Sequence, residues 1–165
     1  MKIAGLIQDS IVDGPGFRFA VYVQGCKMQC DGCHNPETWD IGGGVEMPVE
    51  DIIDQMLKNP LTDGLTLSGG EPFLQAADCA RLAAAAREHG LNVWVFSGYK
   101  FENLSAAEDD NMPDRSKLLE LTDVLVDGPY IAQYRSLSLK WRGSKNQRIL
   151  DIPKSIAAGR AVVLL

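Results

Sequence analysis

The sequence predicts an α/β fold, namely a partial, open (β/α) barrel with about 5 to 6 mostly parallel strands in one domain that spans residues 1–165. Short β-branched and aromatic runs alternate with helical patterns, which is typical of a parallel sheet covered by helices. A complete eight-strand barrel needs about 200 residues or more. Since the chain has 165 residues and shows no internal repeat or domain boundary, we expect an incomplete barrel.

A turn separates the first two expected strands. Residues 13–16 read Asp-Gly-Pro-Gly, and glycine tolerates positive φ while proline fixes its own φ. The next run, 17–23, is aromatic and β-branched and leads directly into a loop rich in cysteine. The cysteines are therefore expected at the carboxyl end of a strand. The first helix is expected over 49–57, with Pro48 at its start and acidic residues in its first turn.

The second half of the chain repeats the order of strand, loop and helix. A strand at 64–68 is followed by Gly69-Gly70-Glu71-Pro72 and by an alanine-rich helix over 75–88. The remaining expected elements are strands at 92–96 and 124–126, a polar loop from Ser105 to Arg115, and two possible strands at 147–150 and 161–165.

Composition and charge limit the classes of function. With 16 basic and 22 acidic residues the formal net charge is −6, which disfavours nonspecific binding to nucleic acid or to an anionic membrane. No apolar run approaches the roughly 20 residues that cross a bilayer, and residues 1–9 become polar too early for a signal peptide. We therefore expect a cytoplasmic protein with reduced cysteines and without nucleic-acid or membrane partners.

The charge is unevenly distributed. From Gly128 to Leu150 there is no acidic residue. The same segment contains five basic residues, which are Arg135, Lys140, Arg142, Lys145 and Arg148. The segment is either a solvated face or a contact surface for a partner or an anionic ligand.

Three of the four cysteines, Cys26, Cys30 and Cys33, lie within eight residues in the spacing C-x3-C-x2-C. Residues 30–34 also match the C-x-x-C-H pattern of covalent haem attachment, which leaves Cys26 unexplained. A closed zinc site could include His34 or Cys79, but zinc modules usually take their ligands from two separated pairs. The spacing favours a [4Fe-4S] cluster with three thiolate ligands and one open iron.

Four segments with unusual chemistry follow expected strands. They are the loop that contains Cys26, Cys30 and Cys33, called the cysteine loop below, and the segments Ser68 to Pro72, Ser97 to Tyr99, and Asp127 to Tyr130. In parallel sheets, ligands bind beyond the carboxyl ends of the strands. We therefore expect these four loops to converge on one site.

The cysteine motif resembles the signature of the radical S-adenosylmethionine (SAM) superfamily, in which the methionine moiety of SAM chelates the open iron. Gly32 departs from this signature, because the superfamily commonly has an aromatic residue there. Ser10 to Arg18 and Cys33 to Trp39 look like the glycyl-radical activating enzymes. Within that group, Val126 to Tyr130 and Trp141 to Arg148 resemble the subfamily whose partner is an anaerobic (class III) ribonucleoside-triphosphate reductase.

This resemblance, which spans Ser10 to about Leu150, implies a TIM-like partial barrel of the radical SAM type with a [4Fe-4S] cluster and SAM as cofactors. It implies an activating enzyme that generates a 5′-deoxyadenosyl radical and installs a glycyl radical on the reductase, with an electron donor such as flavodoxin or ferredoxin. No catalytic side chain is expected, because the cofactors carry the chemistry. The implied metal ligands are Cys26, Cys30 and Cys33, and the implied cofactor-binding residues are Gly32, Cys33, His34, Gly69, Gly70, Glu71, Ser97 and Asp127.

Several of these assignments have alternatives. The segment from Gly69 to Pro72 is assigned by the resemblance to the amino group of SAM, but it could be a simple turn. Ser97 and Asp127 could bind ribose hydroxyls or cap the next turn. Cys79 is expected to be a small buried apolar group. The alternative functions are a pyruvate formate-lyase type activase, another small radical SAM enzyme, or a non-enzymatic iron-sulfur or zinc protein.

Overall fold

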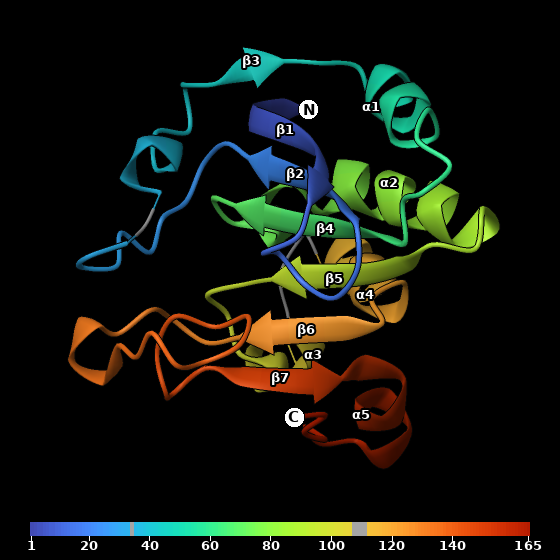
Figure 1. The fold of residues 1–165 in the computed structure, drawn as a ribbon. Helices are drawn as coiled ribbons and strands as arrows, with labels where there is room; N and C mark the ends of the chain where they lie inside the picture. The colour runs from blue at the N-terminus through green and yellow to red at the C-terminus, as the bar shows by residue number, and fades with distance from the viewer. Residues whose placement is uncertain (34, 107–111) are drawn as a thin grey trace.

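The computed structural model describes residues 1–33, 35–106 and 112–165. Over these residues, seven strands form one sheet in the order β3-β1-β2-β4-β5-β6-β7 (Figure 1). The strands are β1 Lys2–Ser10, β2 Arg18–Val23, β3 Val45–Glu46, β4 Gly64–Gly69, β5 Asn92–Phe96, β6 Val124–Asp127 and β7 Arg148–Asp151. The helices are α1 Val49–Met56, α2 Ala76–Glu88, α3 Phe101–Ala106, α4 Met112–Glu120 and α5 Ile152–Ala158, with short 3-10 helices η1 Pro36–Thr38, η2 Pro72–Gln75 and η3 Ala132–Tyr134.

The centre of the sheet is parallel. Strands β2, β4, β5 and β6 pair in parallel, with Val23 beside Gly69 where β2 and β4 end. Antiparallel β1 and β7 flank this centre, and β3 pairs with β1. The expected α/β class and mostly parallel central sheet are confirmed, and the sheet is open because it ends at β3 and β7. The sheet has more strands than the expected 5 to 6. The additional strand β3 could not be predicted, because its two residues are too few to leave a periodic pattern.

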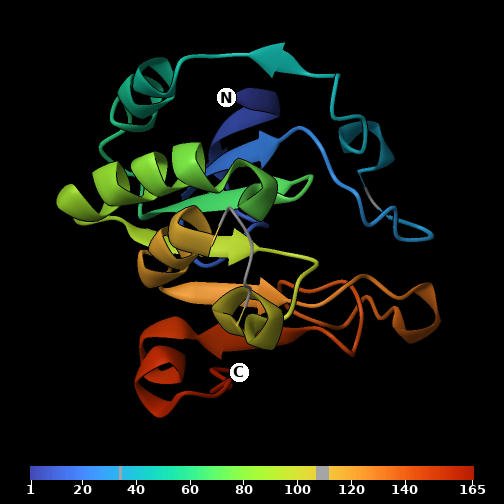
Figure 2. The ribbon, with the colours of Figure 1, turned by 180° about the vertical axis from the view of Figure 1, so that it is seen from behind.

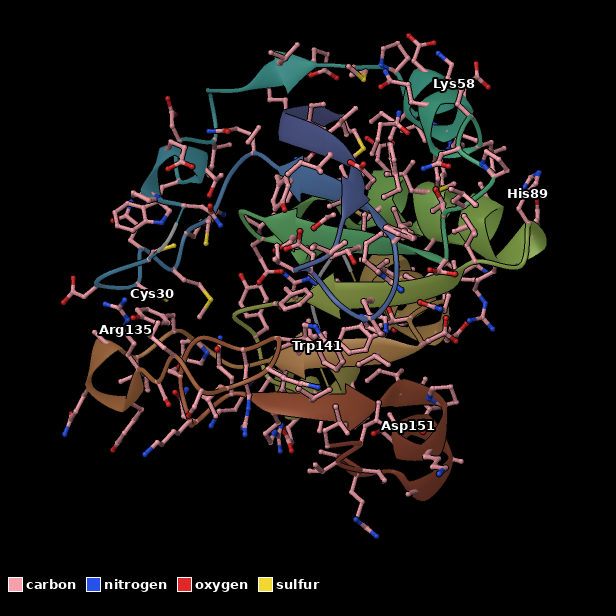
Figure 3. All side chains as sticks on the ribbon, in the orientation of Figure 1. Cys30, Lys58, His89, Arg135, Trp141 and Asp151 are labelled. Atoms are coloured by element: carbon pink, nitrogen blue, oxygen red, sulfur yellow. The ribbon has the colours of Figure 1, made fainter. Side chains whose placement is uncertain are left out.

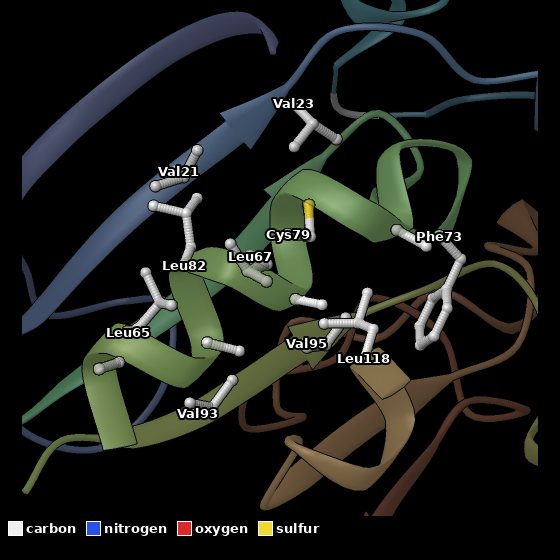
Figure 4. Packing of buried hydrophobic residues seen from close by; sticks show 14 of the residues in the cluster. Val21, Val23, Leu65, Leu67, Phe73, Cys79, Leu82, Val93, Val95 and Leu118 are labelled. Atoms are coloured by element: carbon white, nitrogen blue, oxygen red, sulfur yellow. The ribbon is translucent and has the colours of Figure 1, made fainter. Parts of the chain in front are cut away.

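The main hydrophobic core lies between the sheet and its helices. Helices α2, α3 and α4 cover the face of the sheet that is turned toward the viewer in Figure 2. Buried aliphatic residues of β2, β4 and β5 pack there against α2 and α4 (Figure 4). Cys79 of α2 is fully buried in this core, as the sequence predicted.

The opposite face carries a buried cation. Arg18, at the start of β2, is fully buried and donates to the Leu65 carbonyl oxygen at 2.8 Å and to Thr66 Oγ1 at 3.0 Å. Its guanidinium lies 5.8 Å from the ring centroid of Trp94, and burial lowers its pKa to about 10. Thr66 Oγ1 in turn donates to the Asp13 carbonyl oxygen, so the loop between β1 and β2 is fixed across this face.

The prediction of a loop from Ser105 to Arg115 is wrong for the part of this segment that the structure describes, because that part is helical. Helix α3 continues through Ala106 and α4 starts at Met112, while residues 107–111 lie outside the described residues. The helices form because Leu104 and Leu118 are buried against the core, and the acidic residues between them obscured this spacing. The possible strand at 161–165 is reduced to an isolated bridge between Leu150 and Val163.

Candidate metal centre and cofactor site

The cysteine loop leaves β2 and returns beside its own start. Gly25 N donates to the Thr38 carbonyl oxygen at 2.6 Å, and Cys26 N donates to that of Trp39 at 3.2 Å. The buried Gln24 side chain donates to the carbonyl oxygens of residues 37 and 40 at 3.0 and 2.8 Å. These bonds close the base of the loop, so the three cysteines lie on a segment with two anchored ends.

The three cysteine side chains line one cavity of about 130 Å³ at the carboxyl ends of β2, β4, β5 and β6. The other chemically unusual loops contribute to the same cavity, which confirms that all four converge. Their lining residues are Ser68, Gly69, Gly70, Glu71, Ser97, Gly98, Gly128 and Tyr130, together with Met28, Phe96, Val126 and Gln147. Figure 3 labels Cys30 at this end of the sheet. In the described residues, no three His, Cys, Asp or Glu side chains are placed as ligands of a single metal ion.

The two glycines after β4 allow this loop to contact the base of the cysteine loop. Gly70 N donates to the Val23 carbonyl oxygen and Glu71 N to that of Gly25, both at 2.8 Å. A Cβ on Gly70 would lie 2.4 Å from the Gly25 oxygen, and a Cβ on Gly69 would lie 2.8 Å from the backbone of Tyr22. The close approach that requires glycine here is therefore made by the protein's own backbone.

Glu71 is 1% exposed, and its carboxylate accepts three hydrogen bonds from the protein. Ser97 Oγ and Gly98 N donate to Oε1 at 2.8 Å each, and Phe73 N donates to Oε2 at 3.0 Å. Burial raises the pKa of Glu71 to about 7, and the hydrogen bonds oppose this rise. The carboxylate thus ties the loop after β4 to the loop after β5.

Ser97 and Asp127 are also bonded to the protein. Ser97 Oγ accepts from Tyr99 N at 3.0 Å, and Asp127 Oδ2 accepts from Phe101 N at 2.8 Å. Arg148 donates to both oxygens of Asp127, at 3.0 and 2.6 Å. The bond from Tyr99 N shows the turn-stabilising role for Ser97. Asp127 instead joins β6 to the start of α3 and to β7. Direct contact of either residue with a ribose stays a prediction.

An aromatic ring lies beside the cysteine loop although position 32 is glycine. Gly32 has φ of +75°, where a side chain is disfavoured, and its ideal Cβ position is 3.3 Å from Cε1 of Tyr130. The other edge of the same ring faces Gly143, whose Cβ would lie 3.0 Å from Cδ2. The sequence motif placed Tyr130 at a strand end but did not reveal that it contacts the cysteine loop.

A second cavity, of about 370 Å³, adjoins the first. Both are lined by Cys33, Phe96, Tyr130 and Gln147. Val12, Asn35 and residues 141–143 complete the second cavity. Sequence reasoning missed Phe96, Gln147 and Met28 as site residues, because the apolar last residue of a strand, an amide and a methionine leave no distinctive motif.

One predicted site residue, His34, lies outside the described residues, so its assignment to cofactor binding stays a prediction. Cys79 lies in the core on α2 and does not line the cavity of the three cysteines.

Comparison with known proteins adds independent information. The chain matches the family described as "4Fe-4S single cluster domain" over residues 12–150. It is 35% identical over 147 residues to the anaerobic ribonucleoside-triphosphate reductase-activating protein of Escherichia coli K12, covering 83% of this chain and 90% of that protein.

Two further relatives extend the comparison. The protein of the same name from Enterobacteria phage T4 is 33% identical over 144 residues, with 84% of this chain and 86% of the relative covered. The pyruvate formate-lyase-activating enzyme of Listeria monocytogenes is 34% identical over 147 residues, with 85% of this chain and 57% of the relative covered. The chain therefore belongs to the 4Fe-4S single cluster domain family and to the anaerobic ribonucleoside-triphosphate reductase-activating proteins.

Proposed function

We propose that this protein is a radical SAM activase that installs a glycyl radical on an anaerobic (class III) ribonucleoside-triphosphate reductase. The observation that carries the proposal is the single cavity lined by Cys26, Cys30 and Cys33 together with the loops after β4, β5 and β6. When bound, a [4Fe-4S] cluster and SAM supply the reductive chemistry that yields a 5′-deoxyadenosyl radical. The open sheet supports a partial TIM-like barrel whose missing wall admits a segment of a macromolecular substrate.

The donor set fits the cluster. Three thiols on one anchored loop are soft ligands of the kind that iron-sulfur centres take, and three ligands leave one iron for a small molecule. The surrounding backbone suits a charged cofactor, because Gly69 and Gly70 bring main-chain polar groups to the cavity wall.

The tasks of the cofactor-binding residues follow from their contacts. Both oxygens of Glu71 already accept bonds from the protein, so the segment from Gly69 to Glu71 would bind the SAM amino group through its backbone. Gly32 and Cys33 would border the cofactor from the cysteine loop. We propose a cofactor-binding role also for His34, which lies outside the described residues. Ser97 would form the wall on the ribose side, held rigid by Glu71. Asp127 does not line the cavity and would support this wall, held rigid by Arg148.

The proposed activity is tested by anaerobic reconstitution with iron and sulfide, followed by dithionite and SAM. The protein should release 5′-deoxyadenosine, and addition of the reductase should give a glycyl-radical signal in electron paramagnetic resonance. Cys26→Ala, Cys30→Ala and Cys33→Ala should each lose the cluster absorbance and the release. Cys79→Ala, which changes a cysteine outside the cavity, is the matched control and should retain both. A passive iron-sulfur or zinc protein would release no 5′-deoxyadenosine.

A pyruvate formate-lyase type activase is the second candidate, favoured by the Listeria relative. The chain spans only 57% of that relative, whereas it covers 90% of the Escherichia coli reductase-activating protein. An activation assay with each purified partner enzyme distinguishes the two candidates. We expect the glycyl-radical signal to appear with the reductase and not with pyruvate formate-lyase.

The remaining assignments are proposals. We propose a cytoplasmic location and an electron donor such as flavodoxin or ferredoxin, without nucleic-acid or membrane partners. Within the described residues, no helix combines the length and the apolar character that a membrane span requires.

A further inference from the structure

The segment from Ile131 to Lys145, called the hook below, projects beyond the carboxyl end of β6 beside the cysteine loop (Figure 1). Its two arms are bonded to each other: Lys145 N donates to the Tyr134 carbonyl oxygen at 2.9 Å, and Arg135 and Ser144 form an antiparallel bridge. The fully buried Ser144 accepts from Ile131 N at 3.2 Å through its hydroxyl. The hook is therefore an ordered double segment rather than a loose loop.

The base of the hook is anchored in a second, smaller hydrophobic cluster, which is formed by Trp94, Val124, Val126 and Ile149. Trp141 packs edge-on against Trp94, with the ring centroids 5.1 Å apart. The backbone of Trp141 has φ of +57°, a conformation that is uncommon for a bulky residue and persists only where its surroundings enforce it. Arg142 reinforces this turn by donating to the Gln147 carbonyl oxygen at 2.6 Å. The outer surface of the hook is thus prearranged, which lowers the entropy cost of binding.

The five basic residues of this region fall into two groups. Arg142 and Arg148 are partly buried and bonded to the protein's own oxygens. Arg135, Lys140 and Lys145 are exposed on the hook. Leu137 of the hook is 88% exposed, more than any other large apolar side chain in the described residues. The hook therefore presents one highly exposed apolar side chain and three exposed cations.

We propose that the hook docks onto an acidic protein surface that has an apolar depression for Leu137. Residues 128–150 hold five of the 16 basic residues and none of the 22 acidic ones, while the whole chain carries −6. An acidic partner is therefore repelled by most of this protein and attracted at the hook, which orients the encounter.

The partner follows from the position of the hook and rests on the function proposed above. Trp141, Arg142 and Gly143 line the cavity of about 370 Å³ that adjoins Cys33. A protein bound to the hook would therefore lie at the mouth of this cavity. We assign the docked surface to the reductase and not to the electron donor.

The test uses the charge reversal Arg135→Glu, Lys140→Glu and Lys145→Glu, the neutral set with Gln at the same positions, and Leu137→Ser. The matched control reverses three cations at the other end of the molecule: Lys58→Glu, Lys154→Glu and Arg160→Glu, where Figure 3 labels Lys58 far from Arg135. Binding of the reconstituted protein to the reductase is measured anaerobically at several salt concentrations. The KM and kcat for glycyl-radical formation are measured with dithionite, and 5′-deoxyadenosine release is measured without reductase.

We expect the charge reversal to raise the dissociation constant and KM about tenfold or more and to flatten their salt dependence, with kcat within about twofold. The neutral set and Leu137→Ser should give smaller rises of about threefold or more. The dissociation constant and KM of the control set should stay within about twofold of the wild-type values. Release without reductase should be unchanged in every variant, which separates docking from cofactor chemistry.

If the charge-reversed variant binds the reductase as tightly as the wild type does, the proposal is overturned. It is also overturned if the control set weakens binding equally, because the effect would then come from the net charge of the protein and not from the hook. A defect that appears only when a protein reductant replaces dithionite would assign the hook to the electron donor and also overturn it. If the wild-type protein releases no 5′-deoxyadenosine, the proposed function fails, while the binding measurement still decides the role of the hook.

Discussion

Replacement of Glu71 separates a positioning role from direct ligand binding. Glu71→Ala removes the acceptor of two fixed backbone donors, Phe73 N and Gly98 N, and of the Ser97 hydroxyl, which can rotate. A buried donor left without an acceptor costs about 1–3 kcal/mol. Removal of the buried carboxylate returns part of its desolvation cost. We expect a net loss of about 3 kcal/mol in the free energy of unfolding.

Glu71→Gln is the matched variant. Its amide oxygen can keep the bonds from Ser97 and Gly98, so one donor, Phe73 N, loses its acceptor. The expected loss is about 1 kcal/mol.

Anaerobic urea unfolding, followed by tryptophan fluorescence, measures both variants. With a slope of about 2 kcal/mol per molar, the midpoints should fall by about 1.5 M for Ala and about 0.5 M for Gln. If Glu71→Ala unfolds at the wild-type midpoint but no longer binds SAM, the carboxylate binds the ligand directly and the positioning role is refuted.

Three further perturbations test neighbouring features. Gly70→Ala places a Cβ 2.4 Å from the Gly25 carbonyl oxygen, so it should displace the base of the cysteine loop and lower the iron retained after gel filtration to less than about half of wild type. Cys79→Ser buries a hydroxyl in the apolar core and should cost about 1–3 kcal/mol of unfolding free energy with unchanged iron content; a loss of iron would instead support Cys79 as a ligand. Arg148 lowers the pKa of Glu102 below 4.5, so this pair stabilises the fold above that pH and its contribution disappears as the pH falls through the lowered value. Because Glu102 is more than half exposed, Glu102→Gln should remove at most about 1 kcal/mol at pH 7 and less at pH 3, measured by urea unfolding at both pH values.

Elements with strong local patterns could be predicted from the sequence. The run of β-branched and aromatic residues at 92–96 coincides with β5, and the proline and acidic residues at 48–51 marked the start of α1. The convergence of four loops also followed from the sequence, because parallel strands place their carboxyl ends along one edge.

Features that depend on tertiary contacts could not be predicted. The burial of Arg18 requires Thr66 and Trp94 from two other strands. The direction of the Glu71 carboxylate depends on Ser97, which is 26 residues away in the chain. The contact between Gly32 and Tyr130 joins loops that are almost 100 residues apart, and no local pattern encodes it. The sequence therefore indicated which residues gather at the site but not which of them bond to one another.

The most direct measurement is the release of 5′-deoxyadenosine from SAM by the anaerobically reconstituted, dithionite-reduced protein, with the reductase present and its glycyl-radical signal recorded in parallel. We predict release and a radical signal that both require Cys26, Cys30 and Cys33 and are unaffected by Cys79→Ala. A protein that retains its full iron and sulfide content but produces neither 5′-deoxyadenosine nor a glycyl radical would contradict the proposed function.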